Sequence, residues 1–178
     1  MKKAFRNIEV LNIYSYVNQL TKEKADELPL KFRWNLKKNM DKFRPIAERY
    51  EAFRNEQLQQ LQKSWFNDEK SEEFMQPKTD EAGNPVLDAD GNQETETMRK
   101  IKDEFIDDYK KAAEELNAKL SEIAFEDNVV DIATVDFDSF VDSLPEDSHL
   151  DFDDLTMLSF QDTSTNLVNE NTDNKEAE

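Results

Sequence analysis

A single stretch, residues 29–65, places the strongest limit on how this chain can fold. Its apolar side chains recur mostly at steps of three and four, which puts them on one face of a helix. They are Phe32, Leu36, Met40, Phe43, Ala47, Tyr50, Phe53 and Leu61. A helix of this length runs roughly 50 Å, and its apolar face cannot be buried against itself. The rest of the chain must supply the partners of that face.

Two further segments carry helical periodicity. Residues 7–20 have apolar side chains at Val10, Leu11, Tyr14 and Val17, with Asn7 as an N-cap. Residues 95–123 keep the same spacing, and we expect this helix to pack antiparallel against the long one. Its apolar positions are Met98, Ile101, Phe105, Ala112, Leu116, Leu120 and Ile123.

Pro45 lies inside the long helical pattern. Its ring removes one backbone donor, so the helix either kinks there or breaks. The apolar spacing continues in phase from Phe43 to Tyr50, which favours a kink.

Residues 67–94 form a turn-rich insert. Gly83 and Gly91 are both here, each preceded by acidic residues and followed by Asn, a pattern typical of turns. Residues 85–87 between them predict a brief strand and a small hairpin. The second turn does not fit a calcium loop, because Val86 and Thr97 occupy the first and twelfth positions where carboxylates are needed.

The period changes after residue 125. Residues 128–137 are rich in β-branched side chains and predict a strand. A single strand needs a pairing partner, which is the Val86 segment, a second copy of the chain or another protein. Short acidic helices are predicted at residues 138–144 and 150–160.

These patterns predict a mainly α fold with a minor α+β component. An elongated helical hairpin or bundle occupies residues 1–125, with helices at about 7–20, 29–65 and 95–123 around the insert at 67–94. A strand and short acidic helices packed on it occupy residues 126–160. Residues 161–178 have no apolar periodicity and are predicted to be a disordered tail.

The net charge of −18 is distributed unevenly. Residues 1–65 hold 14 Lys and Arg against 8 Asp and Glu, a net of +6, and residues 66–178 hold the remaining 9 and 33, a net of −24. Phosphate contacts need clustered bases, so we expect no direct nucleic-acid binding. An acidic surface of this kind attracts a basic protein partner.

Side chains that carry most enzyme chemistry are scarce. The chain has no cysteine, two glycines and one histidine, His149, which excludes thiolate metal sites, histidine pairs and glycine-rich phosphate loops. We therefore expect no enzymatic activity, no cofactor and no bound metal. The sequence also lacks a signal-peptide run and any apolar span of membrane length, so an intracellular protein without a membrane partner is expected.

The candidate partner-binding residues lie in an acidic and aromatic segment. Phe and Leu side chains among aspartates are typical of segments that dock into an apolar groove with a basic rim. The candidates are Asp136, Phe137, Asp138, Phe140, Asp142, Leu150, Phe152, Asp153, Asp154 and Leu155. Two interpretations are open: the segment binds another protein, or it folds back onto the chain's own basic N-terminal half. The bases available for folding back include Arg33, Lys37, Lys38, Lys42, Arg44 and Arg49.

The order of features along residues 7–160 carries a resemblance. It consists of the short first helix, Leu28-Pro29-Leu30, Leu36-Lys37-Lys38-Asn39, the helix of residues 48–58, the Gly-Asn turns, the helix at Phe105, Val130-Asp131-Ile132 and residues 150–158. In this order the chain resembles a family of small, uncharacterised tailed-bacteriophage (siphophage) proteins. Residues 66–80 and the tail after Gln161 depart from the family pattern. The resemblance implies a phage or prophage gene acting in the host bacterial cytoplasm or in the virion, and it supplies no catalytic or ligand residue.

The expected function is non-catalytic binding of a host or phage protein through the acidic C-terminal half. One form is an inhibitor or decoy that acts on a host nucleic-acid-handling or defence protein, with carboxylates where phosphates would lie. The alternative is a virion-assembly accessory or a minor structural protein of the head or tail. The unpaired strand and the long apolar face also allow a homodimer.

Overall fold

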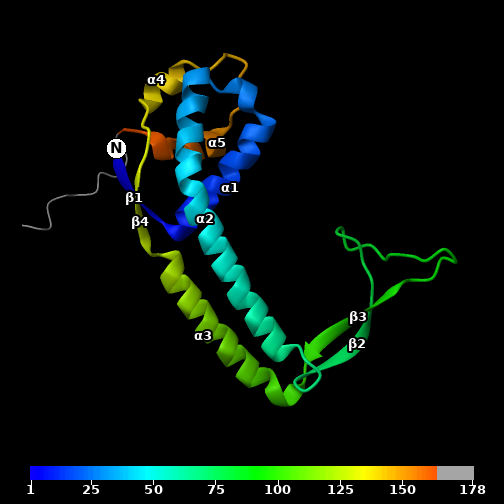
Figure 1. Ribbon diagram of the computed structural model, residues 1–178. Coiled ribbons are helices and arrows are strands. Elements are labelled where there is room, and N and C mark those ends of the chain that lie inside the picture. The colour runs from blue at the N-terminus through cyan, green and yellow to red at the C-terminus, as the bar shows by residue number, and fades with distance from the viewer. Residues whose placement is uncertain (164–178) are drawn as a thin grey trace, which may run out of the picture. The chain divides into compact units, whose positions relative to one another are not determined.

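The structure is a computed structural model that describes residues 1–163. The elements follow in the order β1 (Lys2–Arg6), α1 (Asn7–Glu23), α2 (Leu30–Trp65), β2 (Ser71–Pro77), β3 (Thr95–Ile101), α3 (Ile106–Ala124), β4 (Asp127–Asp131), α4 (Phe137–Asp142) and α5 (Phe152–Leu158). Short 3₁₀ helices span Ala25–Glu27, Asp103–Phe105 and Ser159–Gln161. With five α-helices and two two-stranded sheets in this part of the chain, the protein is mainly α, as predicted (Figure 1).

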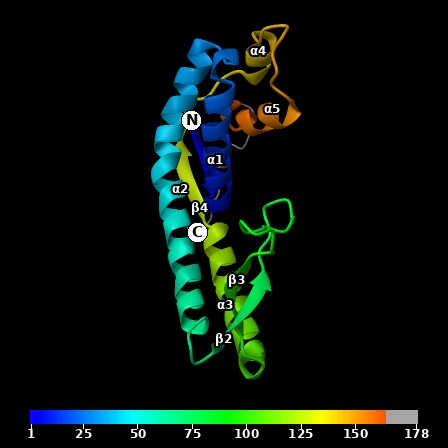
Figure 2. The same ribbon diagram turned by 90° about the vertical axis from the view of Figure 1, so that its right-hand side faces the viewer.

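The chain divides into two compact units, and one of them is built from two separate parts of the chain. Unit 1 comprises Met1–Phe53 and the chain from Ser121 onward, and unit 2 comprises Arg54–Leu120. In unit 1, α1 lies beside the first part of α2 (Figure 2). The two helices bury Val10, Val17, Phe32, Leu36 and Phe43 in one core. Burial of these apolar side chains is the main stabilising contribution to this unit.

Strand β4 has a partner that none of the three predicted alternatives included. It pairs antiparallel with β1 at the start of the chain, from Lys2 opposite Asp131 to Arg6 opposite Asp127 (Figure 1). Only Lys3 and Phe5 of β1 are buried, and a five-residue strand with three bases gives almost no alternation signal. The predicted strand also ends early, at Asp131, and Val135 forms only an isolated parallel bridge with Asp162.

Helix α2 is continuous through Pro45, so the alternative of a full break is wrong. The predicted apolar face is buried from Phe32 to Tyr50, whereas Phe53 is exposed and Leu61 is half-buried. The N-terminal part of the stripe thus forms the core of unit 1.

Unit 2 contains a correction to the predicted third helix. Met98 and Ile101 belong to β3, which pairs antiparallel with β2, and the helix begins only at Ile106. Their spacing of three matches one face of a helix, whereas in a strand it places the two side chains on opposite faces, so periodicity over so few residues indicated the wrong element. Strand β2 was not predicted. Within this unit the Tyr109 ring lies 5.8 Å from the rings of both Trp65 and Phe66, which joins the start of α3 to the end of α2.

The insert contains two turns in place of the predicted strand and hairpin. Isolated bridges join Thr79 to Pro85 and Leu87 to Gln93, in place of a strand at residues 85–87. Gly83 and Gly91 have φ angles of 81° and 83°, in the left-handed region that glycine adopts without strain.

The predicted disordered tail begins too early. Gln161 is fully buried in a 3₁₀ helix, and Val135 pairs with the backbone on either side of Asp162. Residues 164–178 lie outside the described residues.

Asn39 is a fully buried polar side chain in the middle of the apolar face of α2. Its Nδ2 donates to the Ala133 carbonyl at 2.8 Å and to Gln161 Oε1 at 2.9 Å. Its Oδ1 accepts from the Ala133 amide at 2.7 Å. One side chain therefore fastens both the segment after β4 and the end of the described chain to α2.

We expect Asn39→Ala to lower the free energy of unfolding by about 2 to 4 kcal/mol, because buried polar groups at Ala133 and Gln161 lose their partners. Chemical denaturation measures this effect. The control is Asn35→Ala, since Asn35 lies on the same helix and makes no side-chain hydrogen bond within residues 1–163. We expect it to change stability by less than about 0.5 kcal/mol. Equal effects of the two substitutions would contradict the role given to Asn39.

Candidate protein-binding site

The acidic segment, residues 136–160, folds locally because its aspartates cap its own helices. Asp136 accepts a hydrogen bond from the Ser139 amide at the start of α4. Asp151 accepts from the Asp154 amide, and the Asp154 side chain accepts from the Asp151 amide, which forms a capping box at the start of α5. Negative side chains at helix N-termini also interact favourably with the helix dipole.

The aromatic residues of the acidic segment dock it onto the core of unit 1. Phe140 is buried and stacks on Phe32 of α2, with ring centroids 3.7 Å apart and an interplanar angle of 14°. Leu158 is fully buried, and Phe160 packs against the rings of Phe5 and Phe43. The segment is therefore folded onto the N-terminal half of its own chain.

A buried lysine holds the end of the acidic segment. Lys3 is almost fully buried, and its ammonium donates to the carbonyls of Phe160, at 3.0 Å, and Asp162. Burial lowers the pKa of Lys3, and the Asp162 carboxylate only partly opposes this shift.

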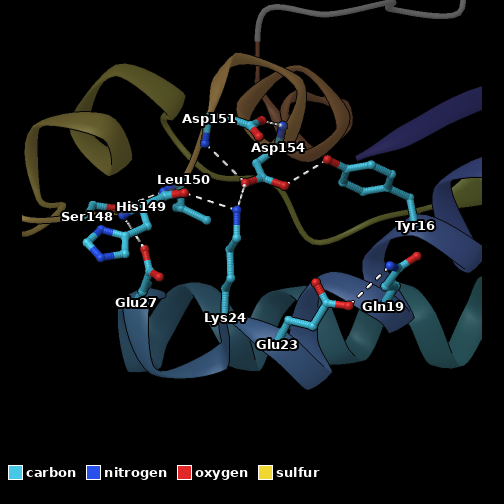
Figure 3. Close-up of polar contacts among 10 residues, drawn as sticks. All are labelled: Tyr16, Gln19, Glu23, Lys24, Glu27, Ser148, His149, Leu150, Asp151 and Asp154. Carbon is cyan, nitrogen blue, oxygen red and sulfur yellow. Dashed lines mark hydrogen bonds and ion pairs between the residues drawn. The ribbon is translucent and has the colours of Figure 1, made fainter.

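A polar cluster fastens α5 to α1 (Figure 3). The buried Asp154 carboxylate accepts from the Tyr16 hydroxyl and from the Lys24 ammonium, each at 2.7 Å. The same ammonium donates to the His149 carbonyl at 3.0 Å. Glu27 completes the cluster by accepting from the His149 amide at 2.6 Å and from the Ser148 hydroxyl at 3.1 Å. Lys24 and Glu27, which follow α1, thus hold the loop before α5, whereas Tyr16 and Lys24 hold α5 itself through Asp154.

The pKa shifts in this cluster favour a structural role. Burial pushes the pKa of Asp154 upward, but hydrogen bonds from Lys24 and Tyr16 outweigh it, so the pKa lies below the ordinary value. The hydrogen bond to Asp154 raises the pKa of Lys24, and it raises the pKa of Tyr16 to about 12. A general acid or base works best with a pKa near the working pH. These shifts move the pKa values of Asp154, Lys24 and Tyr16 away from neutral pH. They keep Asp154 and Lys24 charged.

Four of the six basic residues predicted to receive the acidic segment pair with other carboxylates. Arg33 lies 3.8 Å from Asp26, and Lys37 and Arg44 share Asp41 at 3.6 and 3.3 Å. Lys42 donates to the Asp131 carbonyl and lies 4.0 Å from its carboxylate. None of the six pairs with a carboxylate of residues 136–160 in the described part of the chain. Folding back does occur, but its polar contacts are made by Lys3, Tyr16, Lys24 and Asn39, which no sequence pattern selected.

The ten predicted site residues separate into inward and outward groups. Phe140 and Asp154 are buried, and Phe137, Leu150 and Leu155 are half-buried against the core. The exposed residues are Asp136, Asp138, Asp142, Phe152 and Asp153. Phe152 is 81% exposed, more than any other large apolar side chain in residues 1–163. We call Asp151, Phe152 and Asp153 the Phe152 surface.

Within residues 1–163, no group of three or more His, Asp or Glu side chains is placed to hold a metal ion. The aspartates of the two turns in the insert are used locally. Asp80 accepts from the amides of Ala82 and Asn84, and Asp88 accepts from those of Asp90 and Asn92. These hydrogen bonds lower the pKa of both carboxyls.

Comparisons with known proteins found no matching protein-family model, no matching curated protein and no matching solved structure. Within residues 1–163, no helix is both long enough and apolar enough to span a membrane.

We expect Asp154→Asn to lower the free energy of unfolding by about 2 to 3 kcal/mol at neutral pH, because the amide lacks the charge that pairs with Lys24 and has a donor in place of one acceptor oxygen at a buried position. Asp153→Asn is the matched control, since Asp153 is exposed and should change stability by less than about 0.5 kcal/mol. Thermal or chemical unfolding of the two variants gives the comparison. A destabilisation by Asp153→Asn as large as that by Asp154→Asn would contradict the cluster's role.

The stability difference between wild type and Asp154→Asn should depend on pH. Because the folded-state pKa of Asp154 lies below its ordinary value of 3.8, the charge contributes its full stability above that value. The contribution is lost as the pH falls through the folded-state pKa. The stability difference between wild type and Asp154→Asn should therefore be constant near neutrality and shrink below pH 3.8. A difference that grows in acid would have the wrong sign.

Proposed function

We propose that this chain is a non-catalytic protein-binding protein that recognises a basic protein through the Phe152 surface. The observation that carries the proposal is the exposure of Phe152 between two exposed aspartates, on a helix whose other side is anchored in the core. Exposed aromatic side chains are frequent anchors of protein interfaces, and the flanking carboxylates select a partner with a basic rim.

The surrounding charge supports a basic partner. Residues 136–163 contain nine Asp and Glu and no Lys or Arg. Of these nine acids, only Asp154 forms an ion pair within the described chain, apart from Asp162, which lies near Lys3. Most of the negative charge of this segment is thus left for another molecule, and long-range attraction speeds association with a positive surface.

In the phage setting that the resemblance implies, we propose an inhibitor or decoy of a host protein that handles nucleic acid or serves in defence. A basic groove that receives phosphates would receive these carboxylates instead. The acidic segment is pre-folded in its own unit, which reduces the ordering cost on binding.

A second candidate is a virion-assembly accessory or minor structural protein. It is favoured by unit 2, where the β2–β3 sheet has only two strands and exposes Phe74, Met75 and Met98. An exposed sheet edge beside apolar side chains is a template for pairing with another chain.

The proposal is tested by capturing proteins from infected-cell lysate on immobilised wild type, Phe152→Ala and Phe125→Ala. Phe125 is the matched control because it is an exposed phenylalanine, 55% accessible, that lies under Arg6 rather than between aspartates. We expect one or more proteins to be retained by wild type and Phe125→Ala, lost with Phe152→Ala, and released by about 0.5 M salt, which screens exposed charges.

The identity of the captured protein separates the two candidates. A host nuclease, polymerase or defence protein supports the inhibitor, and capsid or tail proteins alone support the assembly role. Capture that is unchanged by Phe152→Ala and by salt would contradict the proposal that the Phe152 surface is the binding site.

A further inference from the structure

A second exposed surface with the opposite charge lies on the solvent side of α2. Leu30 is 75% exposed and Trp34 is 59% exposed, although the same helix buries Phe32 and Leu36 on its other side. The four-residue spacing places Leu30, Trp34 and Lys38 along one line of the helix. We call Leu30, Lys31, Trp34, Lys37 and Lys38 the Trp34 strip.

The Trp34 strip has the composition of a binding surface. Trp is among the residues most enriched at the centres of interfaces, and neighbouring exposed apolar side chains are a stronger sign of recognition than isolated ones. The Lys38 ammonium lies 5.3 Å from the Trp34 ring centroid, a cation–π contact that helps to hold the ring on the helix surface.

Within residues 1–163, only part of the charge of this strip is neutralised by ion pairs. Residues 30–45 contain six Lys and Arg and a single acid, Asp41, which Lys37 and Arg44 share. Lys31 and Lys38 have no carboxylate partner within residues 1–163. The chemistry that fits the strip is therefore an apolar anchor carried by a negatively charged segment.

The same protein presents a surface of that chemistry. The Phe152 surface has one highly exposed ring between two exposed carboxylates, and it belongs to the same compact unit as the Trp34 strip. Trp34 and Phe152 both stay exposed in the folded chain, so neither covers the other within one molecule.

We propose that the Trp34 strip of one copy binds the Phe152 surface of a second copy. The proposal rests on the function proposed above insofar as it takes the Phe152 surface as a recognition site. The contact is heterologous, because two different patches meet. It closes into a dimer if two such contacts form around a twofold axis, and otherwise it builds larger oligomers. Self-association and binding of a basic partner then compete for Phe152, and a partner in excess separates the copies.

The test is the mass of the full chain in solution as a function of concentration. Sedimentation or light scattering is carried out from about 1 to 300 µM, the range in which small, polar interfaces dissociate. Wild type should rise from the monomer mass of 20.9 kDa to at least twice that value, and about 0.5 M salt should restore the monomer. The substitutions are Trp34→Gln and Phe152→Gln, with Phe125→Gln as the control. Unchanged thermal unfolding checks that each variant is folded.

The decisive sample is a mixture of two variants. Trp34→Gln and Phe152→Gln should each remain monomeric alone, whereas an equimolar mixture should form a heterodimer, since one intact strip meets one intact Phe152 surface. Phe125→Gln should associate like wild type. The proposal is overturned if wild type stays monomeric across the range, if Trp34→Gln associates like wild type, or if the mixture remains monomeric.

Self-association and the proposed binding of a basic partner can be overturned independently of each other. Trp34→Gln should still capture the same basic partner from lysate, because its Phe152 surface is intact. A monomeric wild type that captures its partner would overturn only the self-association and leave the Trp34 strip to a different acidic protein. Self-association without capture of any partner would overturn only the proposed function.

Discussion

The hydrogen bonds of Asn39 are the interaction on which the arrangement of unit 1 depends. An amide in the apolar face of a helix is costly to bury unless its own donor and acceptor atoms are paired. Here the partners are the backbone of Ala133 and the side chain of Gln161, which come from two separate parts of the chain. Because a shifted arrangement would leave these groups unpaired, Asn39 fixes where the acidic segment starts and where it ends.

This constraint decides which residues of the acidic segment are available to another molecule. Phe140, Asp154 and Leu158 face inward and are used to hold the fold. Phe152 and its neighbouring aspartates face solvent on a helix that cannot turn without breaking the bonds of Asp154 to Tyr16 and Lys24. The segment is a structural part of the unit, and in the function proposed above it also carries a fixed recognition surface. Of the two interpretations of the sequence, folding back is observed for the inward face of these helices, and partner binding is proposed for the outward face.

Long helices could be predicted from the sequence, and so could the acidic segment, because periodicity and composition are local properties. Strand β1 could not, since five residues with three bases resemble a solvated terminus until β4 lies beside them. Met98 and Ile101, three residues apart, fitted one face of a helix although both belong to β3. Among the site residues, Asp154 was predicted from its acidic context to bind a partner but is buried within its own unit, and no sequence pattern selected its contacts Lys24 and Tyr16. Their roles come from contacts across more than 120 positions of sequence, which single-sequence reasoning does not reach.

Hydrogen exchange of the isolated protein tests most directly whether the acidic segment is folded onto its own chain. The amides to follow are those of Val135, Phe140 and Leu155, which donate to Gln161, Asp136 and Asp151 respectively. The account predicts that all three exchange at least about 100-fold more slowly than in an unstructured peptide. Exchange of these amides at the unstructured rate, while the amides of α1 remain protected, would contradict it. The Phe152 surface would then belong to a free segment rather than to a fixed one.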